Sequence, residues 1–192
     1  MKIQVESFTH LKEVLGEIRK QGNPYDFIAV DTISALADFL KPVALSMYVN
    51  SAQGKTFVGT DVLQAPHGAG YGVLLSAINN TLDMIKASTK QMIIVGHIKV
   101  SAGDDGDAGD IIKTLDLPGN AKRALARDSD AIALLFRDEN SNLCFNFEAA
   151  GAECGARPTH LSNKKIIVAE YNKETGEFTS HWDRIYQTLS KK

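Results

Sequence analysis

The chain has 192 residues, and its 21 Lys and Arg against 23 Asp and Glu leave a formal net charge of −2. Hydrophobic residues make up 44% and charged residues 23%, a balance that supports a buried core and excludes a wholly disordered chain. The near-neutral charge excludes a nucleic-acid binder that acts through bulk positive charge. No apolar run approaches the roughly 20 residues that a membrane helix needs, and residues 1–6 lack the apolar stretch of a signal peptide.

Size and composition therefore predict a single cytoplasmic domain over residues 1–192, with no membrane partner. The two cysteines, Cys144 and Cys154, are expected to be free thiols, because disulfides are rare in chains that carry no export signal.

The first half of the chain predicts helices that alternate with strands. Three segments carry apolar residues at helical spacing: 7–21 with Ser7 or Thr9 as N-cap, 33–48 with a kink or break at Pro42, and 73–88. Two apolar runs predict strands buried on both faces: 27–30, which ends in Asp31, and 92–95, which ends in Gly96-His97. Residues 50–72 are rich in Gly and polar residues and lack periodicity, which predicts a long, mobile loop.

The second half predicts shorter elements. An acidic, glycine-rich loop over 101–110 is too polar to pack and holds Asp104, Asp105, Asp107 and Asp110. The elements expected after it are a basic helix at 118–127, a third buried strand at 131–136, a hairpin turn at 138–141 into a strand at 142–148, a strand at 166–169, and a turn at 174–177 into 178–182. This order predicts an α/β fold in which a mostly parallel sheet, flanked by helices, has an antiparallel C-terminal edge.

Polar residues end the expected strands, and ligands of open parallel sheets bind beyond the carboxyl ends of their strands. Asp31, His97 and Asp138 are therefore the candidate functional residues. The run from Phe27 to Thr32 has the form of a Walker B strand, in which an emergent carboxylate holds Mg²⁺ through water. The alternative for Asp31 is a carboxylate that caps the following helix.

Several segments occur in the order found in one ATPase family. They are Phe27–Thr32, Met92–His97, Leu117–Lys122, Asp128–Ile132, Arg157–Leu161 and Trp182–Tyr186. Their order over nearly the whole chain resembles the RecA-like core of P-loop ATPases, and is most similar to phage-encoded RecA-like ATPases of single-strand-annealing recombination. The resemblance implies a RecA-like sheet, ATP and Mg²⁺ as cofactors, and a role in DNA recombination in a phage-infected bacterial cell.

The resemblance also assigns roles to individual residues. Asp31 would be the Mg²⁺-associated carboxylate, Thr32 its neighbour at the phosphate end, and His97 the sensor that responds to the γ-phosphate. Lys122 and Arg123 would offer cations to the phosphates of a neighbouring subunit. The simpler alternatives are a hydrogen-bonded histidine at a strand end and a solvated basic helix face.

The sequence departs from the family pattern upstream of Asp31. The family has a strand, a loop of form G-x-x-x-x-G-K-[ST] and a helix before Walker B, because backbone N–H groups and the Lys bind the phosphates. Residues 1–25 contain no such loop, so the chain resembles a RecA-like core with its N-terminal P-loop unit absent. Residues 49–56 match the loop pattern except that Val49 replaces the first Gly, and they lie after Walker B. We expect a Gly-containing mobile loop there, because a β-branched Val disfavours the tight turn.

Three functions fit these observations. The first is a recombination ATPase whose hydrolysis depends on a partner chain that carries the P-loop. The second is a non-catalytic RecA-like module for assembly or for binding DNA or protein. The third is an unrelated α/β enzyme in which Asp31 and His97 act as an acid/base pair.

Two kinds of partner follow from the resemblance. A sheet without its P-loop strand exposes an apolar edge, which predicts a homo-oligomer or a tight partner chain. Single-stranded DNA would face residues 50–72 and 101–113, although the four aspartates of the second segment oppose phosphate binding.

Overall fold

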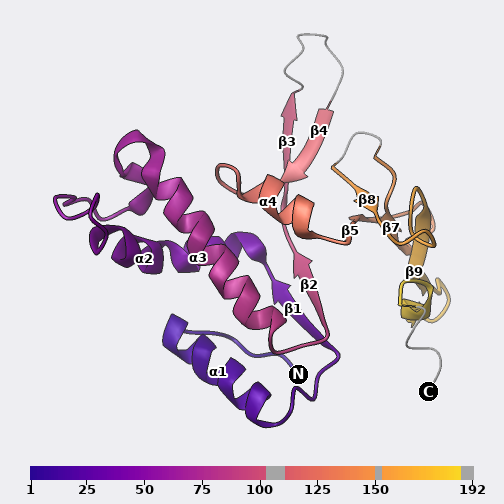
Figure 1. Cartoon of the computed structure of the whole chain (residues 1–192). Helices are drawn as coiled ribbons and strands as arrows, with labels where there is room; N and C mark the ends of the chain where they lie inside the picture. Colours follow the sequence, from indigo (N-terminus) through magenta and orange to yellow (C-terminus); the bar gives the residue numbers. More distant parts are fainter. Residues whose placement is uncertain (103–110, 150–152, 187–192) are drawn as a thin grey trace. The chain divides into compact units, whose positions relative to one another are not determined.

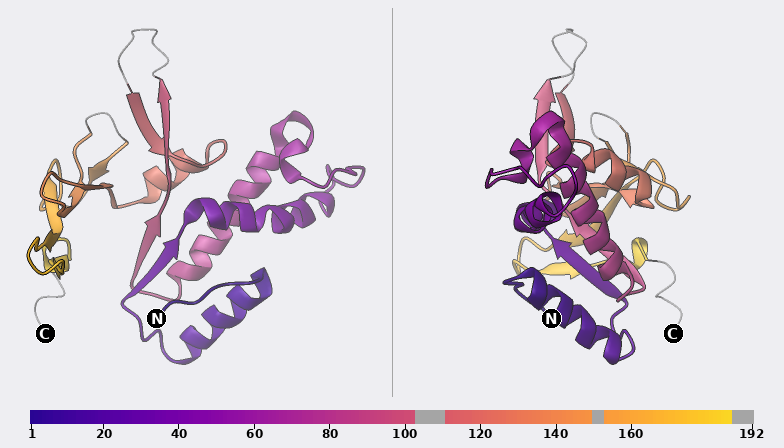
Figure 2. Two further views of the ribbon diagram at one scale, coloured as in Figure 1. Left: turned by 180° about the vertical axis from the view of Figure 1, so that it is seen from behind. Right: turned by 60° about the vertical axis from the view of Figure 1, so that its left-hand side comes forward.

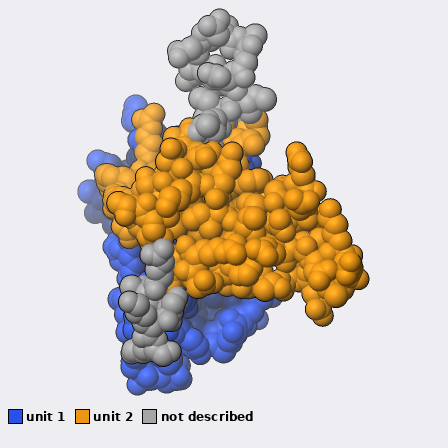
Figure 3. Space-filling view, turned by 90° about the vertical axis from the view of Figure 1, so that its right-hand side faces the viewer, with its two compact units in different colours: residues 1–98, 115–122 blue, residues 99–114, 123–192 orange. Residues whose placement is uncertain are grey.

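The computed structural model describes residues 1–102, 111–149 and 153–186. The chain forms two compact units, coloured separately in Figure 3. The first contains residues 1–98 and 115–122, and the second contains residues 99–114 and 123–192. The expectation of one domain over the whole chain stays a prediction. The four aspartates at positions 104 to 110 lie outside the described residues.

The first unit is a small parallel sheet with three helices. Its elements are α1 (Phe8–Lys20), β1 (Phe27–Asp31), α2 (Ile33–Val49), the 3-10 helices η1 (Val62–Gln64) and η2 (Pro66–Gly68), α3 (Ala69–Lys86) and β2 (Gln91–Val95). α2 and α3 lie side by side (Figures 1 and 2). The Ser7 hydroxyl accepts a hydrogen bond from the His10 N–H at 3.0 Å, which confirms Ser7 as the N-cap of α1.

β1 and β2 pair in parallel, as the sequence predicts. The register runs from Phe27 opposite Gln91 to Asp31 opposite Val95. The prediction that both strands are buried on both faces is wrong, because Ala29 is exposed and Val95 is 41% exposed. A parallel strand is buried on both faces only where helices cover both faces of its sheet, and here no residue of either strand is fully buried.

Of the kink or break predicted at Pro42, a break does not occur, because α2 runs through Pro42 from Ile33 to Val49. A proline inside a helix removes one backbone hydrogen bond and costs about 3 kcal/mol. Leu40 and Ala44, on either side of Pro42, are fully buried, so the packing of this turn offsets the local cost.

Part of the segment expected as a mobile loop, residues 50–72, is instead packed structure. It contains η1 and η2, and α3 already begins at Ala69. Val62 is fully buried, and Gly70 lies so close to the Val62 carbonyl that a Cβ atom would overlap it. The Phe57 ring packs edge-on against Tyr48, with centroids 5.4 Å apart. These contacts join residues that have no periodic relation in the sequence.

The second unit contains short strands. Its described elements, some of which begin or end in the first unit, are β3 (Ile98–Ala102), β4 (Ile111–Leu115), α4 (Ala121–Asp128), β5 (Ala131–Ile132), β6 (Leu134–Arg137), β7 (Leu143–Asn146), β8 (Gly155–Ala156), β9 (Lys165–Tyr171), β10 (Phe178–Ser180) and the 3-10 helix η3 (Trp182–Arg184). The pairings are β3 with β4, β5 with β8, and the order β10-β9-β7-β6 in a four-stranded antiparallel sheet. Its core is Phe147, Leu161, Val168 and Ile185.

The expected mostly parallel sheet is not found in the described part of the chain. β1–β2 is the parallel pair there, and the strands of the second unit with a described register pair antiparallel. The segment predicted as a third buried strand, 131–136, is divided into β5 and β6, which pair with different partners. An apolar run predicts a strand but not the direction of its neighbour.

Local predictions for the second unit are confirmed. β6 and β7 form the expected antiparallel hairpin, and the turn before Glu177 leads from β9 into β10. Cys144 and Cys154 are free, and burial raises the pKa of both thiols.

Among the described residues no helix is long and apolar enough to cross a membrane.

The packing of α3 predicts a large effect of truncating Ile78, which is fully buried. Ile78→Ala is expected to lower the free energy of unfolding by about 2–5 kcal/mol, because it removes buried apolar atoms and leaves a cavity. Val58→Ala is the control, since Val58 is 96% exposed and its truncation is expected to change stability by less than about 0.5 kcal/mol. Urea unfolding of both variants measures the difference. Equal midpoints would contradict the packing of this helix.

Candidate functional site

Asp31 and His97 lie at the same edge of the first unit. Asp31 ends β1 opposite Val95, the last residue of β2, and His97 follows two residues later. Because the strands are parallel, their carboxyl ends meet at one edge, where ligands of such sheets bind. Both side chains are exposed. Two of the three strand-end candidates, Asp31 and His97, thus lie at one edge, whereas Asp138 belongs to the second unit.

Thr32 connects this edge to α2. Its hydroxyl oxygen accepts a hydrogen bond from the Ala35 N–H at 3.2 Å and caps the helix. Thr32, rather than Asp31, is therefore the capping residue, and the Asp31 carboxylate is not used by the helix start. The Asp31–Thr32 peptide bond is cis.

A segment before α4 also lies at this edge. The Asp116 N–H donates to the His97 carbonyl at 2.9 Å, and the Asp116 carbonyl accepts from the Ser34 hydroxyl at 2.8 Å. Sequence reasoning missed Ser34 and Asp116. The sequence signal available was Asp116, a charged residue between the apolar Leu115 and Leu117, but this pattern does not indicate which residues Asp116 contacts.

The edge is not a closed metal site. In the described ranges no group of three or more His, Cys, Asp or Glu side chains is placed to hold a metal ion. Fewer than three such side chains therefore meet at this edge in the described ranges. That arrangement differs from the multi-carboxylate cages of Ca²⁺ and resembles Mg²⁺ sites, which keep several waters and use one or two carboxylates together with substrate phosphates.

A family model described as an AAA domain matches residues 1–184. The chain belongs to the AAA domain family. No curated protein and no solved structure matches it significantly. AAA domains are P-loop ATPases that bind ATP with Mg²⁺, so the family confirms the ATPase class of the sequence resemblance. The recombination role and the phage context stay predictions.

The described residues of this AAA domain fit Mg²⁺ better than they fit the phosphates of ATP. No G-x-x-x-x-G-K-[ST] pattern occurs in the sequence. The near match at residues 49–56 follows a helix instead of a strand, and no helix begins at its Lys55 or Thr56. Its Gly54 N–H donates to the Ser51 carbonyl, and the Gly54 Cα lies against the Tyr48 carbonyl. This turn is folded onto α2, so it does not form a phosphate cradle.

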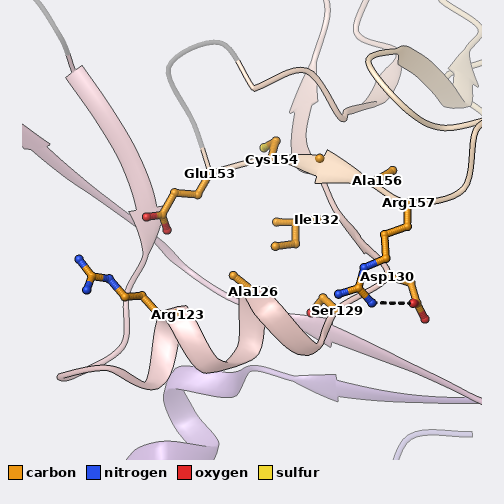
Figure 4. Close-up of a pocket in the computed structure, with 10 residues that line it drawn as sticks. Arg123, Ala126, Ser129, Asp130, Ile132, Glu153, Cys154, Ala156 and Arg157 are labelled. Carbon is orange, nitrogen blue, oxygen red and sulfur yellow. Dashed lines mark hydrogen bonds and ion pairs between the residues drawn. The ribbon is translucent and has the colours of Figure 1, made fainter.

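Lys122 and Arg123, the candidate cations at the start of α4, have different surroundings. Lys122 is partly buried and belongs to the first unit. Arg123 is exposed and lines an open groove of about 540 Å³ in the second unit. Figure 4 shows Arg123 at one end of this groove and the Asp130–Arg157 ion pair at the other. The role of Lys122 and Arg123 as cations for the phosphates of a neighbouring subunit stays a proposal.

The later segments that carried the resemblance make structural contacts. Gly119 has φ +59°, and its Cα lies against the Tyr71 ring. Arg157 donates to the Arg127 carbonyl at 2.6 Å, which satisfies the C-terminal end of α4. His160 Nε2 lies 3.0 Å from the Ile185 carbonyl and must donate, because a carbonyl only accepts. These residues of the resemblance therefore have structural roles in the described part of the chain.

Asp138, the third strand-end candidate, has a structural role in the β6–β7 turn. Its Oδ1 accepts from the N–H groups of Asn140 and Asn142, both at 2.9 Å, and its Oδ2 accepts from the Asn142 side-chain amide at 2.9 Å. These hydrogen bonds hold the pKa of Asp138 below its usual value of 3.8, and the bond from the Asn142 side-chain amide has the largest effect.

This turn predicts acid sensitivity. Because the folded-state pKa of Asp138 is lowered, its contribution to stability is complete above the unfolded value of 3.8 and is lost as the pH falls through the folded value. Asp138→Asn is therefore expected to lower Tm near pH 7 and to reduce the loss of Tm between about pH 5 and pH 2. Scanning calorimetry over this range measures both, with the exposed Glu139→Gln as control. A parallel pH dependence of Tm in wild type and Asp138→Asn would contradict the assignment.

Proposed function

We propose that this AAA domain supplies the Mg²⁺-facing side of an ATP-hydrolysing site. The observation that carries the proposal is the parallel register of β1 and β2, which puts Asp31 and His97 on one edge. Asp31 accepts hydrogen bonds from the water ligands of Mg²⁺, and His97 occupies the sensor position next to the γ-phosphate. The capped start of α2 holds the backbone after Asp31 in place.

Each residue of the edge has a defined task. The Asp31 carboxylate orients the hydrated metal, and the Thr32 hydroxyl, whose oxygen accepts from Ala35, retains its own proton to donate. The exposed His97 imidazole offers an N–H to a phosphate oxygen. When bound, Mg·ATP supplies the phosphoryl group that passes to water and the cation that neutralises its charge.

The phosphate-binding part of the site is proposed to come from a segment outside these 192 residues, carried by a partner chain. The support is the absence of a G-x-x-x-x-G-K-[ST] pattern from the sequence and the folding of residues 49–56 onto α2. Lys122 and Arg123 are proposed to face the phosphates of an adjacent subunit in a homo-oligomer, as the resemblance implies.

Nucleotide binding and hydrolysis test this proposal. A slowly hydrolysed ATP analogue with Mg²⁺ is expected to show no saturable binding to the chain alone in titration calorimetry. The tagged chain is then recovered from its own host together with the polypeptide that carries G-x-x-x-x-G-K-[ST], and ATP hydrolysis by the pair is measured. Asp31→Ala is expected to lower hydrolysis about 10–100-fold, the usual cost of removing a group that orients metal ligands.

Asp83→Ala is the matched control, because Asp83 is an exposed carboxylate on α3 away from the edge. Saturable binding by the chain alone would contradict the separate phosphate-binding segment. Full hydrolysis by the Asp31→Ala pair would contradict the role of Asp31. Recovery of no P-loop partner, together with no nucleotide binding, would favour a non-catalytic assembly module instead.

We also propose single-stranded DNA as the partner in phage recombination or strand annealing. The support is the sequence resemblance together with two exposed lysines, Lys99 on β3 and Lys113 on β4. These strands pair with each other, and lysines on paired strands can contact successive phosphates.

Fluorescence anisotropy with a single-stranded oligonucleotide tests this DNA contact. The double variant Lys99→Ala/Lys113→Ala is expected to weaken binding and to reduce the slope of log K against log salt by about 1.4, because each phosphate contact on a single strand contributes about 0.7. Lys20→Ala/Lys86→Ala is the control with the same charge change on α1 and α3. An equal loss in both double variants would indicate only bulk charge, and would contradict a DNA contact at β3–β4.

A further inference from the structure

His97 lies beyond the β1–β2 ladder. The last registered pair is Asp31 with Val95, so strand pairing brings His97 to the same edge as Asp31 but does not fix its position beyond Val95. Its backbone is held instead by the hydrogen bond from the Asp116 N–H to the His97 carbonyl, at 2.9 Å. Such a contact restricts a residue that would otherwise be free to move at a strand end.

A second hydrogen bond connects Asp116 to α2. The Ser34 hydroxyl donates to the Asp116 carbonyl at 2.8 Å. Ser34 is the second residue of α2, and its position is fixed by the Thr32 cap and by the fully buried Ile33. The two bonds, here named the Ser34–Asp116 tie, therefore link the start of the helix after Asp31 to the backbone of His97.

The packing beneath the tie restricts it further. A Cβ atom on Gly96 would overlap the Leu115 side chain and approach Ile33 to 3.1 Å. Leu115 thus occupies the space left by the absent side chain of Gly96, directly beside Asp116. The tie is anchored on both sides by apolar contacts, which limits its possible geometries.

We propose that Ser34 is a positioning residue for His97, and that the Ser34–Asp116 tie sets where the His97 side chain lies relative to Asp31. This inference rests on the proposed function, in which His97 senses the γ-phosphate. β3 begins at Ile98, directly after His97, and β4 ends at Leu115, directly before Asp116.

Solution NMR of the full chain tests the tie without any nucleotide. Ser34→Ala removes the hydroxyl, and is expected to move the His97 ring signals and to speed amide hydrogen exchange at Asp116 about fivefold, the effect of losing one ordinary hydrogen bond. Ser34→Thr retains a hydroxyl and is expected to restore both values. Asp116→Ala is expected to leave both nearly unchanged, because the tie uses only the backbone of Asp116.

Ser76→Ala is the matched control, since the Ser76 hydroxyl bonds only within α3, to the Gly72 carbonyl. A purely structural role of Ser34 would lower Tm and shift signals throughout α2 without a particular effect on His97. Unchanged His97 signals in Ser34→Ala would overturn the inference, whatever the ATPase assays show.

Hydrolysis by the reconstituted pair then separates this inference from the proposed function. Ser34→Ala is expected to lower kcat with little change in KM, and to cause no further loss when combined with His97→Ala, because both act through one group. A loss that adds fully to that of His97→Ala would overturn the inference. If the NMR effects occur and hydrolysis does not depend on His97, the sensor role in the proposed function fails while the tie is confirmed.

Discussion

The parallel pairing of β1 with β2 is the constraint on which the candidate site depends. Two segments 64 residues apart, at Phe27 and Gln91, align so that both strands end together. This alignment requires the intervening chain to cross over, and α2, η1, η2 and α3 provide that crossover. Because the carboxyl ends of parallel strands share an edge, Asp31 and His97 lie at the same edge. Nothing in the sequence around either residue indicates this proximity.

The helices stabilise this small sheet from one side. Ile33, Leu40, Leu74 and Ile78 are almost completely buried, and they belong to α2 and α3. A two-stranded parallel sheet is not stable without such cover. Ala29 and Val95 remain exposed in this unit, contrary to the expectation of two strands buried on both faces. Family membership shows an AAA domain of the P-loop ATPase class, and the metal-facing role of Asp31 belongs to the function proposed for it.

Local structure in this chain was largely predictable. The cap at Ser7, the β6–β7 hairpin and the turn into β10 follow from short-range hydrogen bonding and apolar spacing, which nearby residues determine. The helix through Pro42 and the packed segment at Val62 were not predictable, because contacts distant in sequence decide them. Ser34 and Asp116 were not predicted either, because their hydrogen bonds join residues distant in sequence. Ser34 contributes a hydroxyl on a helix, and Asp116 contributes only its backbone groups.

By itself the sequence determined where the main helices and the strands β1, β2, β7 and β9 lie, that Asp31 and His97 follow two apolar runs, and that no phosphate-binding loop of the usual pattern is present. Only the tertiary structure decided which strands pair, and it replaced the expected mostly parallel sheet with one parallel ladder in the first unit and antiparallel pairs in the second, among the strands with a described register. The physical reason is that apolar spacing encodes burial of a face, whereas strand direction and partner depend on the path of the connecting chain and on contacts between distant residues.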